Sequence, residues 1–337
     1  MHLDDFDYEL PEELIAQVPV EPRDAARLLV DRGGATPEHR HVRDLDSLLG
    51  DGDLLVVNDT RVIPARLRLS RHSGGSAEVL LLEPIDAARR VWEAMVRPGR
   101  KLKQGERLVT STGLELVEIG RRTAAGDTTE VTILGEGDAL GLLGEHGEMP
   151  LPPYITTPLE SPDRYQTVYA AAPASAAAPT AGLHLTPELL ERLDRRGVEL
   201  ARVELVVGLD TFKPVNSDDP RNHEMHSERY HVPADVMERC RAARRVVAIG
   251  TTSVRALESA ATFGELEGRT RLFIHQPYDW KVVDVMMTNF HLPRTTLIMM
   301  IDAFVGERWR RIYGAAIAER YRMLSFGDAM LLDRHLT

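Results

Sequence analysis

Short runs of hydrophobic residues that end in polar residues recur along the chain and predict its strands. Residues 53–57 (D-L-L-V-V) show the pattern of a fully buried strand. The clearest helix begins at Thr186, where a capping threonine, a proline and an acidic residue precede leucines at helical spacing. Further strands are expected over residues 28–30, 198–207, 246–249, 272–275 and 281–287. Strands that alternate with helices in this way indicate an α/β fold.

The pattern changes between residues 62 and 152. Short strand candidates separated by glycine and turn residues follow one another there, over residues 65–69, 77–82, 91–96, 107–109, 114–119 and 129–134. A helix is expected only at residues 138–144, and such closely spaced strands are typical of a small β-barrel or sandwich. We therefore predict a discontinuous α/β main domain, residues 1–61 and 153–337, with a small β-barrel domain, residues 62–152, inserted into it.

Composition narrows the class of protein. The 337 residues suit about two domains, and 43% hydrophobic with 28% charged residues is ordinary for a globular chain. One cysteine, Cys240, allows no internal disulfide, the first residues lack a signal-peptide pattern, and no apolar run is long enough to span a bilayer. We expect a cytoplasmic protein without a membrane segment. A net charge of -11 argues against general nucleic-acid coating but leaves room for a local basic patch.

Polar side chains collect in loops that follow predicted strands or precede predicted helices. They are Asn58, Asp59 and Arg61 after residues 53–57, Thr180, Gly182 and His184 in A-P-T-A-G-L-H-L-T, Thr251, Thr252 and Arg255 in G-T-T-S-V-R, and Asn289 and His291 in T-N-F-H-L-P. Ligands bind at the carboxyl ends of strands in open α/β sheets, and helix starts favour anionic or polar groups. Structural alternatives remain open, including a capped turn at Arg61 and a surface ion pair between Arg255 and Glu258.

Two familiar kinds of site are disfavoured. The loop at residues 250–253 matches neither G-x-x-x-x-G-K-[ST] nor G-x-G-x-x-G, which argues against kinase, ATPase and nicotinamide dehydrogenase chemistry. Residues 222–231 (N-H-E-M-H-S-E-R-Y-H) are rich in histidine and glutamate, but their spacing matches no strong zinc pattern. We therefore predict no metal site and expect His226 and Glu228 to serve in hydrogen bonding or proton transfer.

Eight motifs, taken in order, cover nearly the whole chain. They are D-F-D-Y-E-L-P, G-D-L-L-V-V-N-D-T-R-V-I-P-A-R, A-P-T-A-G-L-H-L-T, V-G-L-D-T-F-K-P-V, M-H-S-E-R-Y, G-T-T-S-V-R-A-L-E-S, T-N-F-H-L-P-R-T-T-L and S-F-G-D-A-M-L. Together they resemble the S-adenosylmethionine:tRNA ribosyltransferase-isomerase family of queuosine biosynthesis. The resemblance implies an α/β domain with an inserted β-barrel, the same architecture that the hydrophobic pattern predicts.

The resemblance also implies a reaction. The ribosyl part of S-adenosylmethionine would move to 7-aminomethyl-7-deazaguanine at the wobble position of tRNA, giving epoxyqueuosine in tRNA, adenine and methionine. S-adenosylmethionine is then a co-substrate, no metal or redox cofactor is required, and we expect a monomer acting on the anticodon region of tRNA. Two alternatives are a tRNA methyltransferase that uses the same donor and a tRNA-binding protein without catalysis.

Residue type and motif matching suggest roles within that reaction. We expect acid/base work from His184 and His291, with Glu228 and Asp59 behind them. The residues expected to bind substrate are Asn58, Arg61, Thr180, Gly182, His226, Thr251, Thr252, Arg255 and Asn289, the threonines and Arg255 holding the ribose or the methionine carboxylate. Contacts to the tRNA backbone are expected from Arg97, Arg100, Lys101 and Lys103 in the barrel and from Arg308, Arg310 and Arg311 near the end of the chain.

The chain departs from the family pattern at a few positions. Ala174-Ser175-Ala176 stands where the family has Gly-Ser-Val, and Leu185 replaces a phenylalanine. The other departures are Asp210 for glycine in V-G-L-G-T-F, Gln276-Pro277-Tyr278 for P-G-Y, and Val285 for the glycine of V-V-D-G. These changes bear on the wall of the pocket and leave Thr180, His184, Asn289 and His291 in place.

Overall fold

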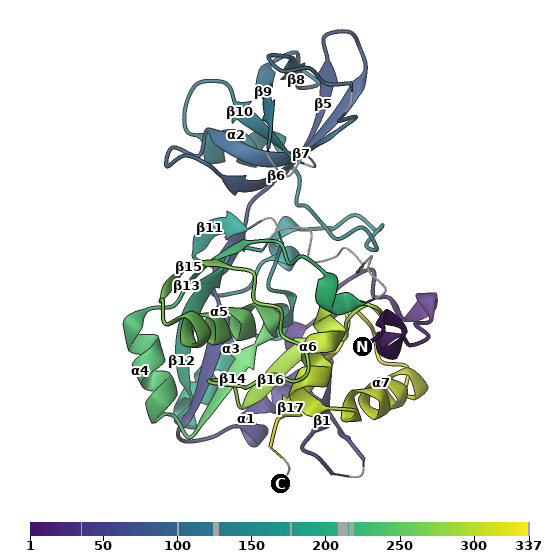
Figure 1. Cartoon of the computed structure of the whole chain (residues 1–337), viewed down its shortest axis with the longest axis vertical. Coiled ribbons are helices and arrows are strands. Elements are labelled where there is room, and N and C mark those ends of the chain that lie inside the picture. Colours follow the sequence, from purple (N-terminus) through teal and green to yellow (C-terminus); the bar gives the residue numbers. More distant parts are fainter. Residues whose placement is uncertain are drawn as a thin grey trace.

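The computed structural model describes residues 1–34, 36–99, 101–123, 128–175, 177–207, 215 and 219–335. They form two bodies stacked along the long axis of the molecule, an α/β main domain and a smaller barrel (Figure 1). The chain leaves the main domain after one central strand, builds the barrel, and returns at the same end of the main sheet (Figure 1). The fold class predicted from the hydrophobic pattern is confirmed.

A nine-stranded sheet forms the centre of the main domain, with strand order β15-β13-β12-β3-β14-β16-β17-β1-β2. Its strands are β1 (Arg27–Asp31), β2 (Glu38–His41), β3 (Asp53–Asn58), β12 (Glu199–Leu205), β13 (Glu228–His231), β14 (Arg245–Ile249), β15 (Glu267–Thr270), β16 (Val285–Asn289) and β17 (Ala329–Asp333). The four central strands β12, β3, β14 and β16 are parallel, and β17 runs antiparallel to β16. A separate parallel pair joins β4 (Thr60–Val62) to β11 (Ala172–Ser175).

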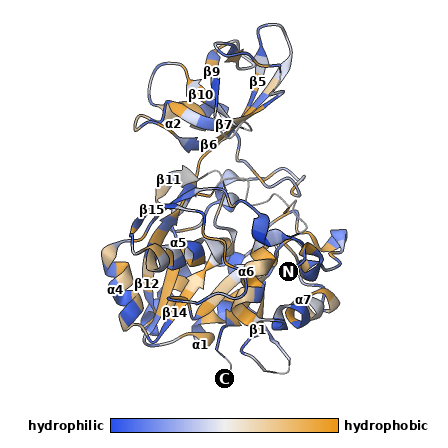
Figure 2. Cartoon of the chain, in the orientation of Figure 1, coloured by the Kyte–Doolittle hydropathy of each residue, from blue (hydrophilic) through white to orange (hydrophobic). Residues whose placement is uncertain are grey.

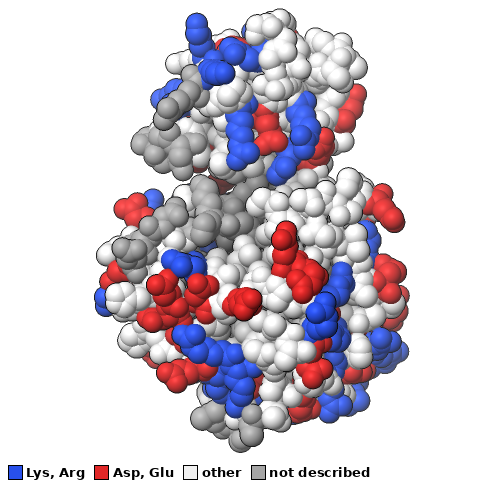
Figure 3. Space-filling view, turned by 90° about the vertical axis from the view of Figure 1, so that its right-hand side faces the viewer, with Lys and Arg blue, Asp and Glu red and all other residues white. Residues whose placement is uncertain are grey.

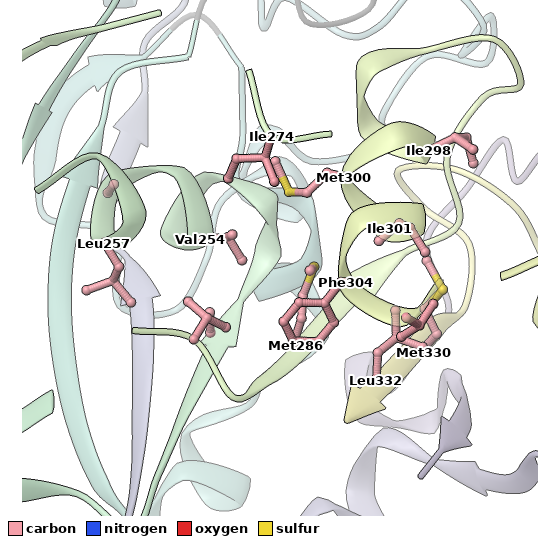
Figure 4. Packing of buried hydrophobic residues seen from close by; sticks show 14 of the residues in the cluster. Val254, Leu257, Ile274, Met286, Ile298, Met300, Ile301, Phe304, Met330 and Leu332 are labelled. Atoms are coloured by element: carbon pink, nitrogen blue, oxygen red, sulfur yellow. The ribbon is translucent and has the colours of Figure 1, made fainter. Parts of the chain in front are cut away.

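Helices cover both faces of this sheet, which is why its strands are hydrophobic at successive positions (Figure 2). In β3, Leu54 and Val56 face one core, whereas Leu55 and Val57 face the other. The first core takes in α4 (Ala234–Ala242), α5 (Gly250–Phe263), α6 (Thr296–Val305) and α7 (Arg308–Ala318), and the second takes in α1 (Leu45–Leu48) and α3 (Pro187–Arg195). Figure 4 shows residues of α5 and α6 packed over β16 and β17.

The expected strands of the inserted domain close into a barrel of order β10-β7-β6-β5-β8-β9. They are β5 (Arg66–Arg71), β6 (Ser76–Pro84), β7 (Val91–Arg97), β8 (Arg107–Val109), β9 (Glu115–Arg122) and β10 (Thr129–Ile133), followed by helix α2 (Ala139–His146). The barrel has its own core, in which Trp92 is fully buried. In β5 and β10, buried side chains alternate with more exposed ones, the period of two that a strand with one face on a core shows.

Two expected strands differ from the structure. Residues 272–275 form no strand, because the Leu272 N–H donates to Thr270 Oγ1 at 3.0 Å in a turn. The strand expected at residues 281–287 begins only at Val285. The N–H groups of residues 281–283 donate instead to the buried Glu258 carboxylate, at 3.0–3.1 Å, and are lost to the sheet. A single buried side chain, Glu258, thus delays the start of the strand.

Candidate active site

The carboxyl ends of the parallel strands meet at one end of the main sheet, and the polar loops gather there. Between β11 and α3 the chain makes a 3-10 turn, η6 (Thr180–His184), which packs against β16. Thr180 Oγ1 donates to Asn289 Oδ1 at 2.9 Å, and Asn289 Nδ2 donates to His184 Nε2 at 3.1 Å. One chain of hydrogen bonds therefore joins η6 to β16, although Thr180 and Asn289 are 109 positions apart in the sequence.

His184 stands behind this chain, where it lines a separate, very small pocket with Arg23 and Ser325. Its ring is buried, at 5% exposure, and because Nε2 accepts from Asn289 the proton of the neutral ring is on Nδ1. Burial lowers the pKa of His184 to about 4, against the smaller opposing effect of Asp328, so the ring is neutral at neutral pH. This geometry suits a residue that orients the Asn289 amide.

His291 lines a small pocket together with Thr180, Asn289, Thr251 and other residues. Its Nε2 lies 3.1 Å from Thr288 Oγ1, and its backbone N–H donates to Tyr313. Burial lowers the pKa of His291 to about 3, so the ring is neutral and available as a proton acceptor rather than as an imidazolium acid.

The amino terminus of α5 forms another wall of this pocket. Gly250 has φ +85°, a conformation that L side chains rarely adopt, and so permits the sharp turn from β14 into α5. Thr251 and Thr252 follow in the first turn of the helix and line the pocket. Thr252 Oγ1 is buried and has no hydrogen-bond partner among the described residues. A hydroxyl beside unpaired helical N–H groups is suited to a ribose or another polar ligand.

A second cavity, of about 460 Å³, adjoins the pocket and lies between the two domains. Both are lined by Leu297. Glu228, the first residue of β13, and Arg255 of α5 lie in the cavity wall and form a buried ion pair through Arg255 Nη1 and Glu228 Oε2. The exposed His226 also lines it. The alternative of a surface ion pair between Arg255 and Glu258 is wrong, because Glu258 is fully buried and Arg255 pairs with Glu228 instead.

Three predicted residues at or just after the end of β3 lie outside both the pocket and the cavity. Asn58 is buried and bridges two strands, donating to Leu205 O at 2.9 Å and accepting from the Leu205 N–H at 3.3 Å. Asp59 is half-buried, and burial together with the nearby Glu204 raises the pKa of its carboxyl. Arg61 is exposed on β4. Asn58 therefore holds β3 to β12, and the structure does not bring the three side chains to the pocket.

Gly182 is buried for a packing reason. A Cβ at this position would lie far inside van der Waals contact of the Tyr169 hydroxyl and 3.0 Å from Thr167 Cγ2. The residue also lies outside the pocket and cavity walls. A glycine here lets the Tyr169 ring approach the η6 backbone.

The basic residues predicted to contact tRNA fall in separate places. Arg97, the last residue of β7, is exposed, as are Lys101 and Lys103 in the loop that follows, whereas Arg100 lies outside the described residues. Glu93, on the same strand, lines the interdomain cavity, so the basic loop starts about 13 Å further along β7. On the face seen in Figure 3, charges of both signs are spread over both domains.

Arg308 and Arg311 lie at the opposite end of the main sheet from the pocket. Both contact the buried Asp31, at 2.9 Å and 3.2 Å, and Asp31 is the last residue of β1, which runs antiparallel to the central strands. Arg310 stacks over Trp309, with 4.7 Å between its guanidinium carbon and the ring centroid, and donates to Asp5 O. The structure therefore gives Arg308 and Arg311 a role in holding α7 on the sheet.

Several site residues were not identified from the sequence. Tyr154 and Ser325 line the pocket and share a hydrogen bond of 2.7 Å between their hydroxyls, and burial raises the pKa of Tyr154 to about 12. Phe273 lines the cavity. The S-F-G-D motif pointed toward Ser325, but nothing in the spacing of the chain places Tyr154 beside it.

The residues that depart from the family pattern lie at different depths. Leu185 is buried in the core between α3 and the sheet, and Val285 is the buried first residue of β16. Pro277 is exposed. Asp210 and Ala176 lie outside the described residues, as does the side chain of Ala174. None of the described departures lines the pocket or the cavity.

Within the described ranges, no group of three His, Cys, Asp or Glu side chains is placed to hold a metal ion. None of the described helices combines the length and apolar character needed to cross a bilayer.

The fold and the site define a two-domain α/β protein with a small pocket, lined by a histidine, an asparagine and several hydroxyls, beside a larger cavity between the main domain and an inserted barrel. Residues 3–332 match the family described as "Queuosine biosynthesis protein", and the chain belongs to this family. The resemblance drawn from the motifs is thus confirmed.

Relatives with established names are similar over their full length. The chain is 52% identical to the S-adenosylmethionine:tRNA ribosyltransferase-isomerase of Symbiobacterium thermophilum, covering 98% of this chain and 100% of the relative. It is 48% identical to the protein of the same name from Rubrobacter xylanophilus, over 98% of each. The crystal structure of S-adenosylmethionine tRNA ribosyltransferase from Thermotoga maritima matches with a TM-score of 0.55 and 39% identity, over 97% of this chain and 99% of that one.

Proposed function

We propose that this protein transfers and isomerises the ribosyl part of S-adenosylmethionine onto 7-aminomethyl-7-deazaguanine at the wobble position of tRNA. The products are epoxyqueuosine in tRNA, adenine and methionine. The observation that carries the proposal is similarity over essentially the whole chain to ribosyltransferase-isomerases, combined with a neutral histidine and several hydroxyls in one pocket. Because its proposed substrate is tRNA, we expect the protein to act in the cytoplasm.

The chemistry of the donor fits the groups in the pocket. The sulfonium of S-adenosylmethionine acidifies the neighbouring 5′-hydrogens of the ribose, so the reaction needs a base there and a proton source for the departing adenine. His291 is neutral and lines the pocket, and it is our choice for the base. His184 acts through Asn289, whose amide it orients. We expect Thr180, Thr251 and Thr252, which line the pocket, to hold the ribose hydroxyls.

The large cavity between the domains gives tRNA a route to this chemistry. A wobble base must leave its stack to reach a recessed pocket. Phe273 on the cavity wall offers an aromatic surface for such a base, and the exposed Arg97, Lys101 and Lys103 on the barrel are suited to backbone phosphates. We expect a bound tRNA to contact both Phe273 and this basic surface of the barrel.

The decisive experiment identifies the by-products. The purified chain is incubated with S-adenosylmethionine and tRNA that carries the deazaguanine precursor, and small molecules are separated by chromatography. Ribosyl transfer releases adenine and methionine in equal amounts, whereas methyl transfer releases S-adenosylhomocysteine. Binding of tRNA without any of these products would leave a non-catalytic protein and would refute the proposal.

A further inference from the structure

One buried cation in the interdomain cavity lacks a full set of partners. Arg255 is 5% exposed and lines the cavity, and its Nη1 donates to Glu228 Oε2. Its Nε and Nη2 are both buried without a hydrogen-bond partner among the described residues. Burial lowers the pKa of the Arg255 guanidinium to about 10, which leaves it protonated at neutral pH. A buried charge with two unsatisfied hydrogen-bond donors is costly unless a ligand accepts hydrogen bonds from them.

The two unmet donors form one edge of the guanidinium. The N–H bonds of Nε and Nη2 are parallel and match the two oxygens of a carboxylate in a bidentate pair. Glu228 occupies the other side of the group through Nη1, which fixes the plane of the guanidinium. This edge of the guanidinium is therefore suited to a ligand group with two oxygens in one plane, such as a carboxylate.

Apart from Glu228, the carboxylates that line the cavity are already engaged, and so is that of Glu258 on the same helix as Arg255. From the barrel, Glu93 accepts from Thr128 Oγ1 at 2.6 Å, and Glu83 accepts from Arg269 at 2.7 and 2.9 Å. On α5 itself, Glu258 accepts the N–H groups of residues 281–283. The described part of the chain thus leaves the donor pair of Arg255 to a ligand.

We infer that Arg255 binds the carboxylate of the methionyl part of S-adenosylmethionine, an inference that rests on the proposed function. The small pocket, with the threonines and His291, then holds the ribose, and the amino-acid tail extends past Leu297 into the cavity. The negative charge of Glu228 beside Arg255 complements the ammonium of the same tail. The arrangement assigns the two adjoining spaces to the two ends of one donor molecule.

The test compares two unreactive ligands that differ only in the carboxylate. S-adenosylhomocysteine and its decarboxylated counterpart are thioethers without the activating sulfonium, so both can be titrated by calorimetry in the presence and absence of precursor tRNA. A bidentate charged pair should make S-adenosylhomocysteine bind roughly 30- to 100-fold more tightly to the wild-type chain. This comparison needs no substitution and is therefore independent of any folding defect.

Variants then locate the effect. Arg255→Lys keeps the positive charge but removes the two parallel N–H donors of the guanidinium. The preference for S-adenosylhomocysteine over its decarboxylated counterpart should then fall below about 5-fold. Arg269→Lys is the matched control: this arginine lines the same cavity but is engaged by Glu83 and Ser227, and the preference should remain at the wild-type value.

The inference is overturned if the wild-type chain binds both thioethers within about 3-fold, or if Arg255→Lys retains the wild-type preference. Weaker tRNA binding by Arg255→Lys with an unchanged preference would also overturn it, because the partner would then be a phosphate of tRNA. Adenine release by the wild-type chain is measured alongside. Adenine release without a ligand preference contradicts this inference alone, whereas a preference without adenine release contradicts the proposed function alone.

Discussion

Replacement of Gly182 by alanine tests the packing role that the structure gives to a glycine in a motif rich in site residues. The new methyl group would overlap the Tyr169 hydroxyl and would lie 3.1 Å from Tyr169 Cζ and 3.0 Å from Thr167 Cγ2. Tyr169 is itself 7% exposed, so its ring has little room to move. Overpacking of this kind should lower the free energy of unfolding by about 3 kcal/mol.

A second substitution separates the hydroxyl from the rest of the ring. The Tyr169 hydroxyl is buried without a hydrogen-bond partner among the described residues, so Tyr169→Phe should leave stability within about 1 kcal/mol of wild type. In the double variant with Gly182→Ala the nearest overlap is gone and contacts of 3.0–3.1 Å remain. The two substitutions should therefore couple by about 2 kcal/mol.

Urea unfolding of the wild type, both single variants and the double variant measures this coupling. Gly314→Ala is the control, because a Cβ at this exposed position in α7 meets no atom within 4 Å. That variant should gain about 0.5–1 kcal/mol, the usual benefit of alanine over glycine in a helix. Additive effects at Gly182 and Tyr169, within about 0.5 kcal/mol, would refute the packing argument.

Four further predictions concern the site and the tRNA surface. Burial lowers the pKa of His184 to about 4 and of His291 to about 3, so as the pH drops the unfolded chain is protonated before the folded one. The free energy of unfolding should therefore fall by roughly 1.4 kcal/mol per pH unit for each ring between about pH 6.5 and pH 4. A flat profile in urea titrations would contradict the burial of both rings. Asn289→Asp places a carboxylate against His184 Nε2 and should raise the pKa of that ring, which an NMR titration measures; an unchanged pKa would mean that the hydrogen bond is absent. His291→Ala should lower turnover about 100-fold or more if this ring is the base, and near-normal adenine release from a folded variant would remove it from that role. Affinity for tRNA should fall steeply with salt, and Arg97→Gln should reduce the slope of log K against log salt by about 1 if Arg97 meets a phosphate; an unchanged slope would place tRNA elsewhere.

The architecture could be read from local patterns. Residues 53–57 are hydrophobic at every position after the first, and a strand covered by helices on both faces requires that. Thr186 was expected to cap α3, and its Oγ1 accepts from the Leu189 N–H at 3.1 Å. The barrel strands were found from short hydrophobic runs at close spacing, because glycine and turn residues mark where one strand ends and the next begins.

The partners of the site residues could not be read in this way. The spacing left open a pairing of Arg255 with Glu258, one turn along its own helix, but its partner Glu228 lies 27 positions away on β13. Which strand lies next to which, and which rotamer a buried side chain adopts, depend on the packing of the whole domain rather than on spacing along the chain.

The same holds for the A-P-T-A-G-L-H-L-T loop. Thr180 contacts the pocket, His184 supports Asn289 from behind, and Gly182 makes room for Tyr169. Local sequence placed these residues before a helix at the ligand-binding end of the sheet, since caps and periodicity depend only on near neighbours. Their separate roles arose when β16 and the segment that carries Tyr169 packed against the loop, because hydrogen bonds and close contacts depend on distances in space.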